Sequence, residues 1–342
     1  MNPISGIVLI ALGSVGAASF YVPFKKVKIW AWESYWLIQG FAAWIIAPLL
    51  FAFIFIPKGE LVPIIREAPA SAKLMAMFFG FLWGFGGLTF GLSIRYLGIA
   101  LGQSIALGLC AAFGTLIPPV VAGENLFSTN TGILTVVGVA ITVAGISVIG
   151  YAGSLKSAGL SEEEKRAAVK EFALKKGILI AIFAGVMSAC FNFGFESGKP
   201  IEKIALAHGT NPLFQKNASL IFILLGGFIT NLVYCVYLNI RNRTYRDYLS
   251  VPLNIFLNNV FYTFLAGFLW FLQFHFFGMG SSKLPPGMAI FGWSILMALN
   301  IAISNIWGIF LNEWKGVGRK TIIFLAIGIA ILILSTFIVK LG

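Results

Sequence analysis

Ten stretches of this sequence contain no Asp, Glu, Lys or Arg, and each is at least 19 residues long. A helix needs about 20 apolar residues to cross the hydrocarbon core of a bilayer. Strands of a membrane barrel would alternate apolar and polar residues, and the Ile-Leu-Ile-Leu run at 331–334 does not alternate. We therefore predict an all-α integral membrane protein with ten transmembrane helices, which lie within residues 1–24, 34–57, 74–94, 96–123, 125–155, 177–195, 217–240, 248–282, 284–312 and 321–339.

The composition supports this prediction and argues against an enzyme. Apolar residues make up 59% of the 342 residues and charged residues only 11%, whereas a soluble domain carries roughly 25% charged residues. The chain has eleven Glu, one Asp (Asp247), two His and three Cys. A metal site or a carboxylate dyad needs several such side chains close together. We therefore predict no enzymatic activity, no metal and no cofactor.

The net charge of +12 raises the question of nucleic-acid binding, but the basic residues are distributed as in a membrane protein. Of the 24 Lys and Arg residues, 16 follow the odd-numbered predicted helices. Cytoplasmic loops of membrane proteins carry such an excess. We therefore predict no nucleic-acid partner, odd-numbered loops in the cytoplasm, and both termini outside the cell inner membrane.

The longest polar interruption, residues 156–176, divides the predicted helices into five and five. An odd number of spans in each half forces the halves into opposite orientations, which is the inverted-repeat plan of many secondary transporters. A Phe-Leu-Trp sequence also occurs at 81–83 and again at 268–270. We therefore predict two inverted five-helix repeats, 1–155 and 177–342, joined by a charged cytoplasmic linker at 156–176.

Several segments resemble one known family. Residues 16–33 contain the run Pro-Phe-Lys-Lys-Val-Lys followed by Trp-Ala-Trp-Glu, and further matching pieces lie at 83–98, 199–200, 269–273 and 313–319. These segments are similar to the bacterial L-rhamnose–proton symporter family, within the drug/metabolite transporter superfamily. The resemblance runs over the whole length with the same ten-span plan. It implies sugar uptake driven by a proton gradient.

A sugar is polar at its edges and apolar on its C–H faces, so its site needs a few fixed hydrogen-bonding groups and aromatic plates. Trp83 and Trp270 occupy matching places in the two halves, and Gln273 shares a helix face with Trp270 at i+3. Core packing, interfacial anchoring and hydrogen bonds between helices are the alternative roles for such residues. The predicted substrate-binding residues are Gln273, Trp270, Trp83, Asn192, His275, Gln39 and Tyr21.

Proton coupling needs a group that titrates, and ionisable residues within a membrane are functional candidates by default. We predict Glu33, His275 and Glu196 for this role. Each also has a structural alternative. Glu33 would favour the dipole of a helix start, Glu196 would pair with Lys199, and His275 would hold a neighbour or the sugar.

Together these features predict a transporter that imports a small neutral sugar, L-rhamnose or a related deoxy sugar, with protons by alternating access. Its partners would be the sugar, protons and the lipid bilayer. An exporter of metabolites or a nucleotide-sugar exchanger of the same superfamily is the alternative, and an exchanger's site should offer cations for phosphate. A membrane-embedded enzyme and a channel are more distant alternatives. The sequence leaves the coupling stoichiometry and the oligomeric state open.

Overall fold

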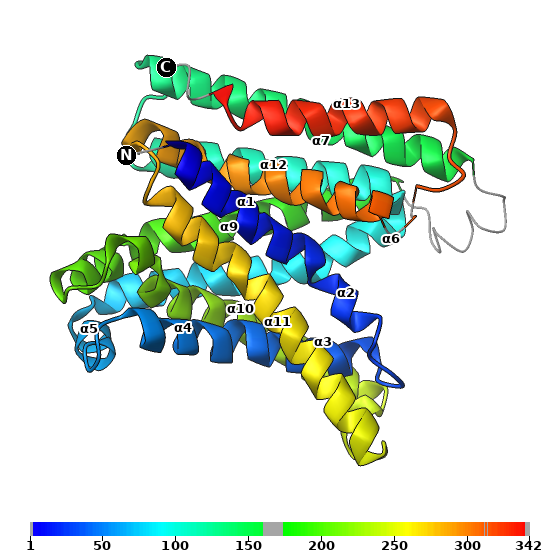
Figure 1. Ribbon diagram of the computed structural model, residues 1–342, viewed down its shortest axis with the longest axis horizontal. Helices are drawn as coiled ribbons and strands as arrows, with labels where there is room; N and C mark the ends of the chain where they lie inside the picture. The colour runs from blue at the N-terminus through cyan, green and yellow to red at the C-terminus, as the bar shows by residue number, and fades with distance from the viewer. Residues whose placement is uncertain (1–2, 160–173, 311, 313, 339–342) are drawn as a thin grey trace. The chain divides into compact units, whose positions relative to one another are not determined.

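The computed structural model describes residues 3–159, 174–310, 312 and 314–338. Within these residues the chain forms α-helices, one π-helix and two short 3-10 helices, and it contains no strand. In chain order (Figure 1) the elements are α1 (Pro3–Ser19), α2 (Tyr21–Phe24), α3 (Trp32–Phe41), the π-helix η1 (Ala42–Ile46), α4 (Ala47–Phe55), α5 (Leu61–Glu67), α6 (Ala70–Val121), α7 (Asn130–Ala158), α9 (Leu174–Ala207), η2 (Pro212–Phe214), α10 (Lys216–Arg241), η3 (Thr244–Tyr248), α11 (Leu253–Ser281), α12 (Pro286–Phe310) and α13 (Arg319–Ser335).

The helices confirm the predicted class of an all-α, multi-pass membrane protein. In the described part of the chain, nine segments are long and apolar enough to cross a membrane. The tenth predicted span, 321–339, corresponds to α13, which has 17 residues. Residue 339, the last of the predicted span, lies outside the described ranges. Most of the predicted linker at 156–176 also lies outside them.

One predicted helix boundary is wrong. The charge at Arg95 predicts a break between spans 74–94 and 96–123, but α6 continues without a break from Ala70 to Val121. Two candidate spans, Ala70–Ser93 and Ser104–Val121, lie within it. Arg is a good helix former, so a single arginine interrupts an apolar run without ending the helix.

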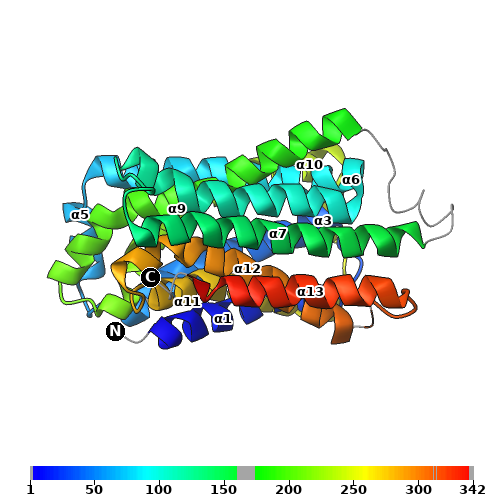
Figure 2. The same ribbon diagram turned by 90° about the horizontal axis from the view of Figure 1, so that it is seen from above.

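The chain divides into two compact units. Unit 1 comprises Met1–Ala11, Phe85–Phe193 and Lys283–Gly342, and unit 2 comprises Leu12–Gly84 and Gly194–Ser282. Each unit therefore contains residues from both predicted repeats, and the inverted repeat itself remains a prediction. In unit 1, α13 lies beside α7 (Figures 1 and 2). Thr142 of α7 donates to Ser335 of α13 across this contact, at 3.0 Å between the two hydroxyl oxygens.

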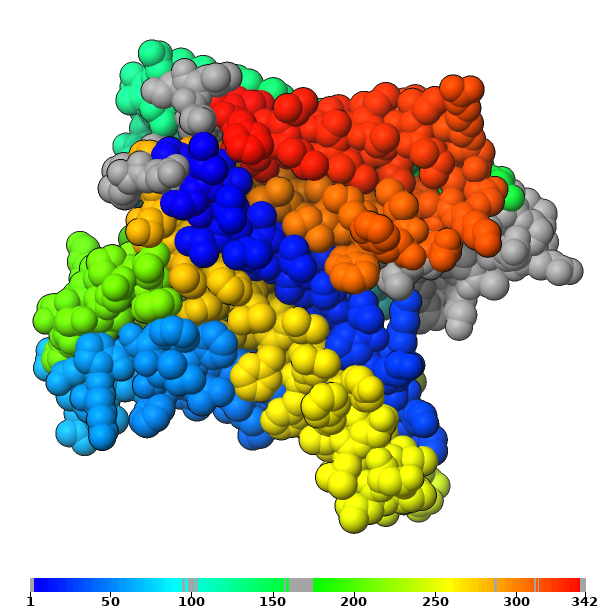
Figure 3. Space-filling model, in the orientation of Figure 1, coloured from blue at the N-terminus to red at the C-terminus, as the bar shows by residue number. Residues whose placement is uncertain are grey.

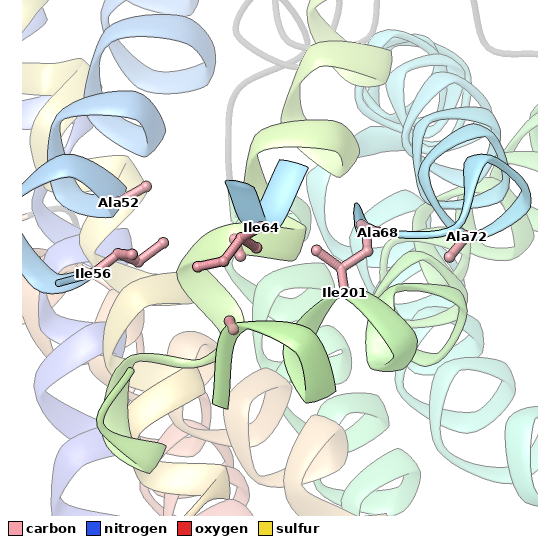
Figure 4. Packing of buried hydrophobic residues seen from close by; sticks show 8 residues of the cluster. Ala52, Ile56, Ile64, Ala68, Ala72 and Ile201 are labelled. Carbon is pink, nitrogen blue, oxygen red and sulfur yellow. The ribbon is translucent and has the colours of Figure 1, made fainter. Parts of the chain in front are cut away.

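Unit 2 is built around the continuous segment α3–η1–α4, which packs against α10 and α11. The contact between α3 and α11 is close because Gly267 has no side chain. A Cβ at this position would lie 2.8 Å from the Gln39 carbonyl oxygen. Short α5 folds onto the same unit through an apolar cluster (Figure 4) that consists of Ala52, Ile56, Ile64, Ala68, Ala72, Ile201, Ala205 and Ala218.

The first half of α11 presents an apolar stripe to its surroundings. Leu253, Leu257, Phe261 and Leu265 are exposed and recur every four residues, and this part of the chain forms open surface in Figure 3. Residues four apart share one helix face. In a membrane protein such a face contacts lipid, so the other face of α11 is the one that can contribute to a site.

Candidate functional site

Three tryptophans meet in unit 2: Trp44 from η1, Trp83 from α6 and Trp270 from α11. The ring centroids of Trp83 and Trp270 are 5.5 Å apart, and Trp44 stands nearly perpendicular to both rings at 5.8 and 5.7 Å. We call these residues the tryptophan cluster. The structure thus brings together the two tryptophans of the repeated Phe-Leu-Trp sequence, and it adds Trp44, which no sequence pattern had marked.

The backbone around Trp44 explains how its ring is placed. Pro48 follows four residues later, and in a regular α-helix a proline ring clashes with the carbonyl four residues before it. The chain widens here into the π-helix η1, in which the Ala47 N–H donates to the Ala42 carbonyl. Single π-helical turns within α-helices are frequently found at functional sites. A proline within an apolar run was therefore the available sequence signal.

Two glycines make room for the rings of the cluster. A Cβ on Gly40 would lie 2.5 Å from the Trp44 ring, and a Cβ on Gly227 of α10 would lie 2.2 Å from the Trp83 ring. Real Cβ atoms do not approach other atoms this closely, so each indole lies directly against backbone. The backbone of α3 at Gly40 and that of α10 at Gly227 therefore fix the rings of the cluster.

The polar atoms beside the cluster differ in their hydrogen bonding. Gln39 is fully buried, and neither its amide nitrogen nor its amide oxygen has a partner among the described residues. The indole N–H of buried Trp44 also lacks one there. Gln273, by contrast, donates to the Trp270 carbonyl at 3.1 Å. Buried polar groups normally have partners, so Gln39 and Trp44 retain hydrogen-bonding capacity that the described residues do not use.

His275 lies further along α11 and is buried among aromatic rings. Its ring is stacked on Phe214 at 5.8 Å between centroids, and Phe51 and Phe55 lie at 4.7 and 5.1 Å. The ring Nδ1 is 3.0 Å from the Asn217 side-chain oxygen. His275 is thus enclosed by apolar rings and has a single amide neighbour in these contacts.

Glu33 lies in the first turn of α3 and is buried, with 6% of its surface exposed. One of its carboxylate oxygens accepts hydrogen bonds from Asn242 Nδ2 and from the Thr244 hydroxyl, both at 2.9 Å. Within the described residues no cation forms an ion pair with it. Glu33 is therefore a buried carboxylate that neutral donors hold.

The only aspartate of the chain lies next to this group. Asp247 of η3 accepts from the Ala31 backbone N–H and the Ser34 hydroxyl, each at 2.7 Å. Tyr248 donates to the Ser34 carbonyl at 3.1 Å, and burial raises the pKa of this tyrosine to about 12. These contacts tie the start of α3 to the segment that follows α10.

Three other predicted residues belong to none of the groups described above. Asn192 belongs to unit 1, where its side-chain nitrogen donates to the Gly114 carbonyl at 2.7 Å. Tyr21 is 58% exposed. Glu196 forms an ion pair with Lys199, three residues away, and both side chains are exposed. This pair matches the structural alternative that the sequence left open for Glu196.

Two further groups of charged residues were missed because their members are distant in sequence. Glu202, buried near the end of α9, accepts from Ser219 at 2.9 Å and lies 3.4 Å from the Lys216 ammonium. His208 lies between two carboxylates, with Nδ1 2.6 Å from Glu60 and Nε2 2.9 Å from Glu67. Hydrogen bonds to Glu67 and then Glu60 raise the pKa of His208.

Comparison with known proteins identifies the family. The family model described as L-rhamnose-proton symport protein matches residues 2–342. The L-rhamnose-proton symporter of Yersinia pestis strain Pestoides F is 34% identical over 343 residues, which cover 99% of this chain and 98% of the relative. That of Citrobacter koseri is 33% identical over 335 residues, covering 97% and 95%. The resemblance drawn from the sequence is therefore confirmed, and the chain belongs to the L-rhamnose-proton symport family.

Proposed function

We propose that this protein imports L-rhamnose together with protons across the cell inner membrane. Membership of the symport family over nearly the whole chain supports this function. A symporter moves solutes without converting them, so the protein is not an enzyme. The excess of Lys and Arg after odd-numbered spans supports an orientation with both termini outside.

The sugar site in this proposal is the tryptophan cluster together with Gln39. Indole faces pack against the C–H faces of a sugar, while amide and indole N–H groups bond its hydroxyls. The single observation that carries the proposal is Gln39, whose two buried amide atoms both lack partners among the described residues. A sugar hydroxyl both donates and accepts, so it can satisfy either atom. Gln273 would hold the backbone of α11 at Trp270 in place through its hydrogen bond to the Trp270 carbonyl.

Glu33 is the proton-coupling residue in this proposal. Protonation would remove the charge from a buried carboxylate and weaken its hydrogen bonds to Asn242 and Thr244. This would weaken one contact between the start of α3 and the segment after α10, while the contacts of Asp247 and Tyr248 would remain. Because α3 continues into η1 and Trp44, the change would pass along α3 toward the sugar site. Coupling requires that proton and sugar favour the same conformation.

The experiment is uptake of labelled L-rhamnose into proteoliposomes, with and without an inward proton gradient. The unsubstituted protein should accumulate the sugar only with the gradient. Trp44→Phe keeps an aromatic ring but removes the N–H, and it should raise KM roughly two- to tenfold, as expected for loss of one buried hydrogen bond. Uptake that ignores the gradient, or that needs a counter-substrate on the other side, would contradict symport.

A further inference from the structure

A second buried amide with an unpaired atom lies at the start of α10, in the same unit as the tryptophan cluster. Asn217, the second residue of α10, is 2% exposed, and His275 of α11 is 4% exposed. The two side chains are in contact at 3.0 Å, through Asn217 Oδ1 and His275 Nδ1. Phe214 and Phe55 cover the imidazole. A polar pair is thus enclosed in aromatic surroundings, which is the chemistry that a sugar site requires.

The hydrogen bonds of Asn217 are incomplete. Its amide can donate two hydrogen bonds through the nitrogen and accept through the oxygen. The oxygen is used by His275, whereas the nitrogen has no partner among the described residues. If the amide is turned over, the nitrogen contacts His275 and the oxygen is left unpaired instead. In either orientation, one buried polar atom of Asn217 is available to a ligand.

Aromatic residues of α11 and α4 link this pair to the elements that carry the tryptophan cluster. His275 follows Trp270 by five residues on α11, which is about 7.5 Å along the helix axis. Phe271 lies between them in sequence and contacts His275 at 6.3 Å between ring centroids. Phe51, seven residues after Trp44, contacts both Phe271 and His275. Phe271 and Phe51 thus connect the pair to α11 and α4, the helices that carry Trp270 and continue from η1.

We propose that Asn217, oriented by His275, forms a hydrogen bond to one ring hydroxyl of the transported sugar and so determines which sugar the protein accepts. This inference rests on the proposed function, since it assigns a specificity role within the same site. A site built to bond a hydroxyl rejects an analogue that lacks it, because the buried partner is then left unpaired. Asn217 is the specificity-determining residue, and His275 is a positioning residue.

The test is a competition experiment with deoxy analogues of L-rhamnose. Each analogue lacks one ring hydroxyl and competes with uptake of labelled L-rhamnose into proteoliposomes. The unsubstituted protein should bind one analogue at least tenfold more weakly than the others. In Asn217→Leu this difference should disappear, while L-rhamnose itself should bind more weakly. Asn217→Ala also removes both amide atoms, with a smaller side chain, and it serves if the leucine variant does not fold.

Asn231 supplies a matched control on the same helix. It is a buried amide whose oxygen accepts from the Trp36 indole and whose nitrogen donates to the Gly227 carbonyl. Asn231→Leu should lower stability and keep the ranking of the analogues. His275→Phe should reduce the discrimination, because Asn217 loses its anchor, without changing which hydroxyl is read.

Two outcomes overturn the inference in different ways. If L-rhamnose uptake is normal but the analogue ranking is the same in the unsubstituted protein and in both Asn217 variants, Asn217 does not contact the sugar. If the unsubstituted protein takes up no L-rhamnose at all, the proposed function fails and the inference fails with it. Loss of stability with an unchanged ranking identifies a purely structural amide.

Discussion

Replacing Gln39 by methionine should stabilise the empty protein and abolish sugar binding. Both amide atoms of Gln39 are buried without partners among the described residues. Each such atom costs about 1–3 kcal/mol, and methionine fills a similar volume without polar atoms. Taking the lower limit for each of the two atoms, the free energy of unfolding should rise by about 2 kcal/mol. The same change removes the groups that we assign to the sugar hydroxyls.

The assay is thermal unfolding of the purified protein with and without L-rhamnose. A ligand that binds only the folded state raises Tm with its concentration. The unsubstituted protein should therefore show a sugar-dependent rise in Tm. Gln39→Met should start from a higher Tm and show little or no rise. Asn231→Leu removes an amide whose hydrogen bonds are satisfied, so it should lower Tm and retain the response to sugar.

A different result would refute the reasoning about unpaired groups. If Gln39→Met lowers Tm as much as Asn231→Leu does, Gln39 is satisfied in the folded protein, for example by water. If its response to L-rhamnose is also unchanged, the sugar does not contact Gln39. The tryptophan cluster would then need a different polar partner.

Three further predictions concern coupling, pH and packing. Glu33→Gln should lose gradient-driven accumulation of L-rhamnose. It should keep the exchange of labelled for unlabelled L-rhamnose, because exchange moves no net protons. Loss of both activities would contradict a coupling role. The carboxylates raise the pKa of His208, so its contacts to Glu60 and Glu67 should stabilise α5 fully below the ordinary pKa of about 6.5 and lose this effect as pH rises through the higher folded pKa. Hydrogen exchange of residues 61–67 should therefore become less protected as pH rises through that value, and His208→Ala should remove this pH dependence. In Gly80→Ala, a Cβ 1.9 Å from the Ile223 carbonyl oxygen should separate α6 from α10 and lower Tm sharply. Gly87→Ala in the same helix meets no atom within 4 Å and should raise stability by up to about 1 kcal/mol; equal effects of the two alanines would contradict the close-packing argument.

The membrane spans were predictable because bilayer thickness requires about 20 apolar residues for each spanning helix, and the length of an apolar run can be read from the sequence. The predicted break at Arg95 failed because that criterion detects charge, whereas a helix ends where its backbone hydrogen bonds end. Nothing around Arg95 removes a backbone donor, and α6 continues. Pro48 does remove one, and there the helix changes its pitch without ending. The proline was the more informative residue.

The candidate site was predictable only in part. The repeated Phe-Leu-Trp sequence drew attention to Trp83 and Trp270, which do meet. Trp44 had no such marker, since its position depends on η1 and on Gly40. Asn217 begins a charge-free stretch and would be assigned to a membrane interface by sequence alone. Its contact with His275 joins residues 58 positions apart, and a single sequence contains no record of such pairs.

In the proposed mechanism, the unpaired polar atoms link sugar binding to conformational change. A fold selected for stability alone would pair every buried donor and acceptor. Gln39, Trp44 and Asn217 together leave four such atoms without partners among the described residues, so the empty conformation is less stable than it would be with those atoms paired. A sugar that satisfies them stabilises this conformation selectively, and a ligand shifts a conformational equilibrium only by such a difference in affinity. An apolar replacement that improves stability should therefore weaken the response to sugar at each of these positions.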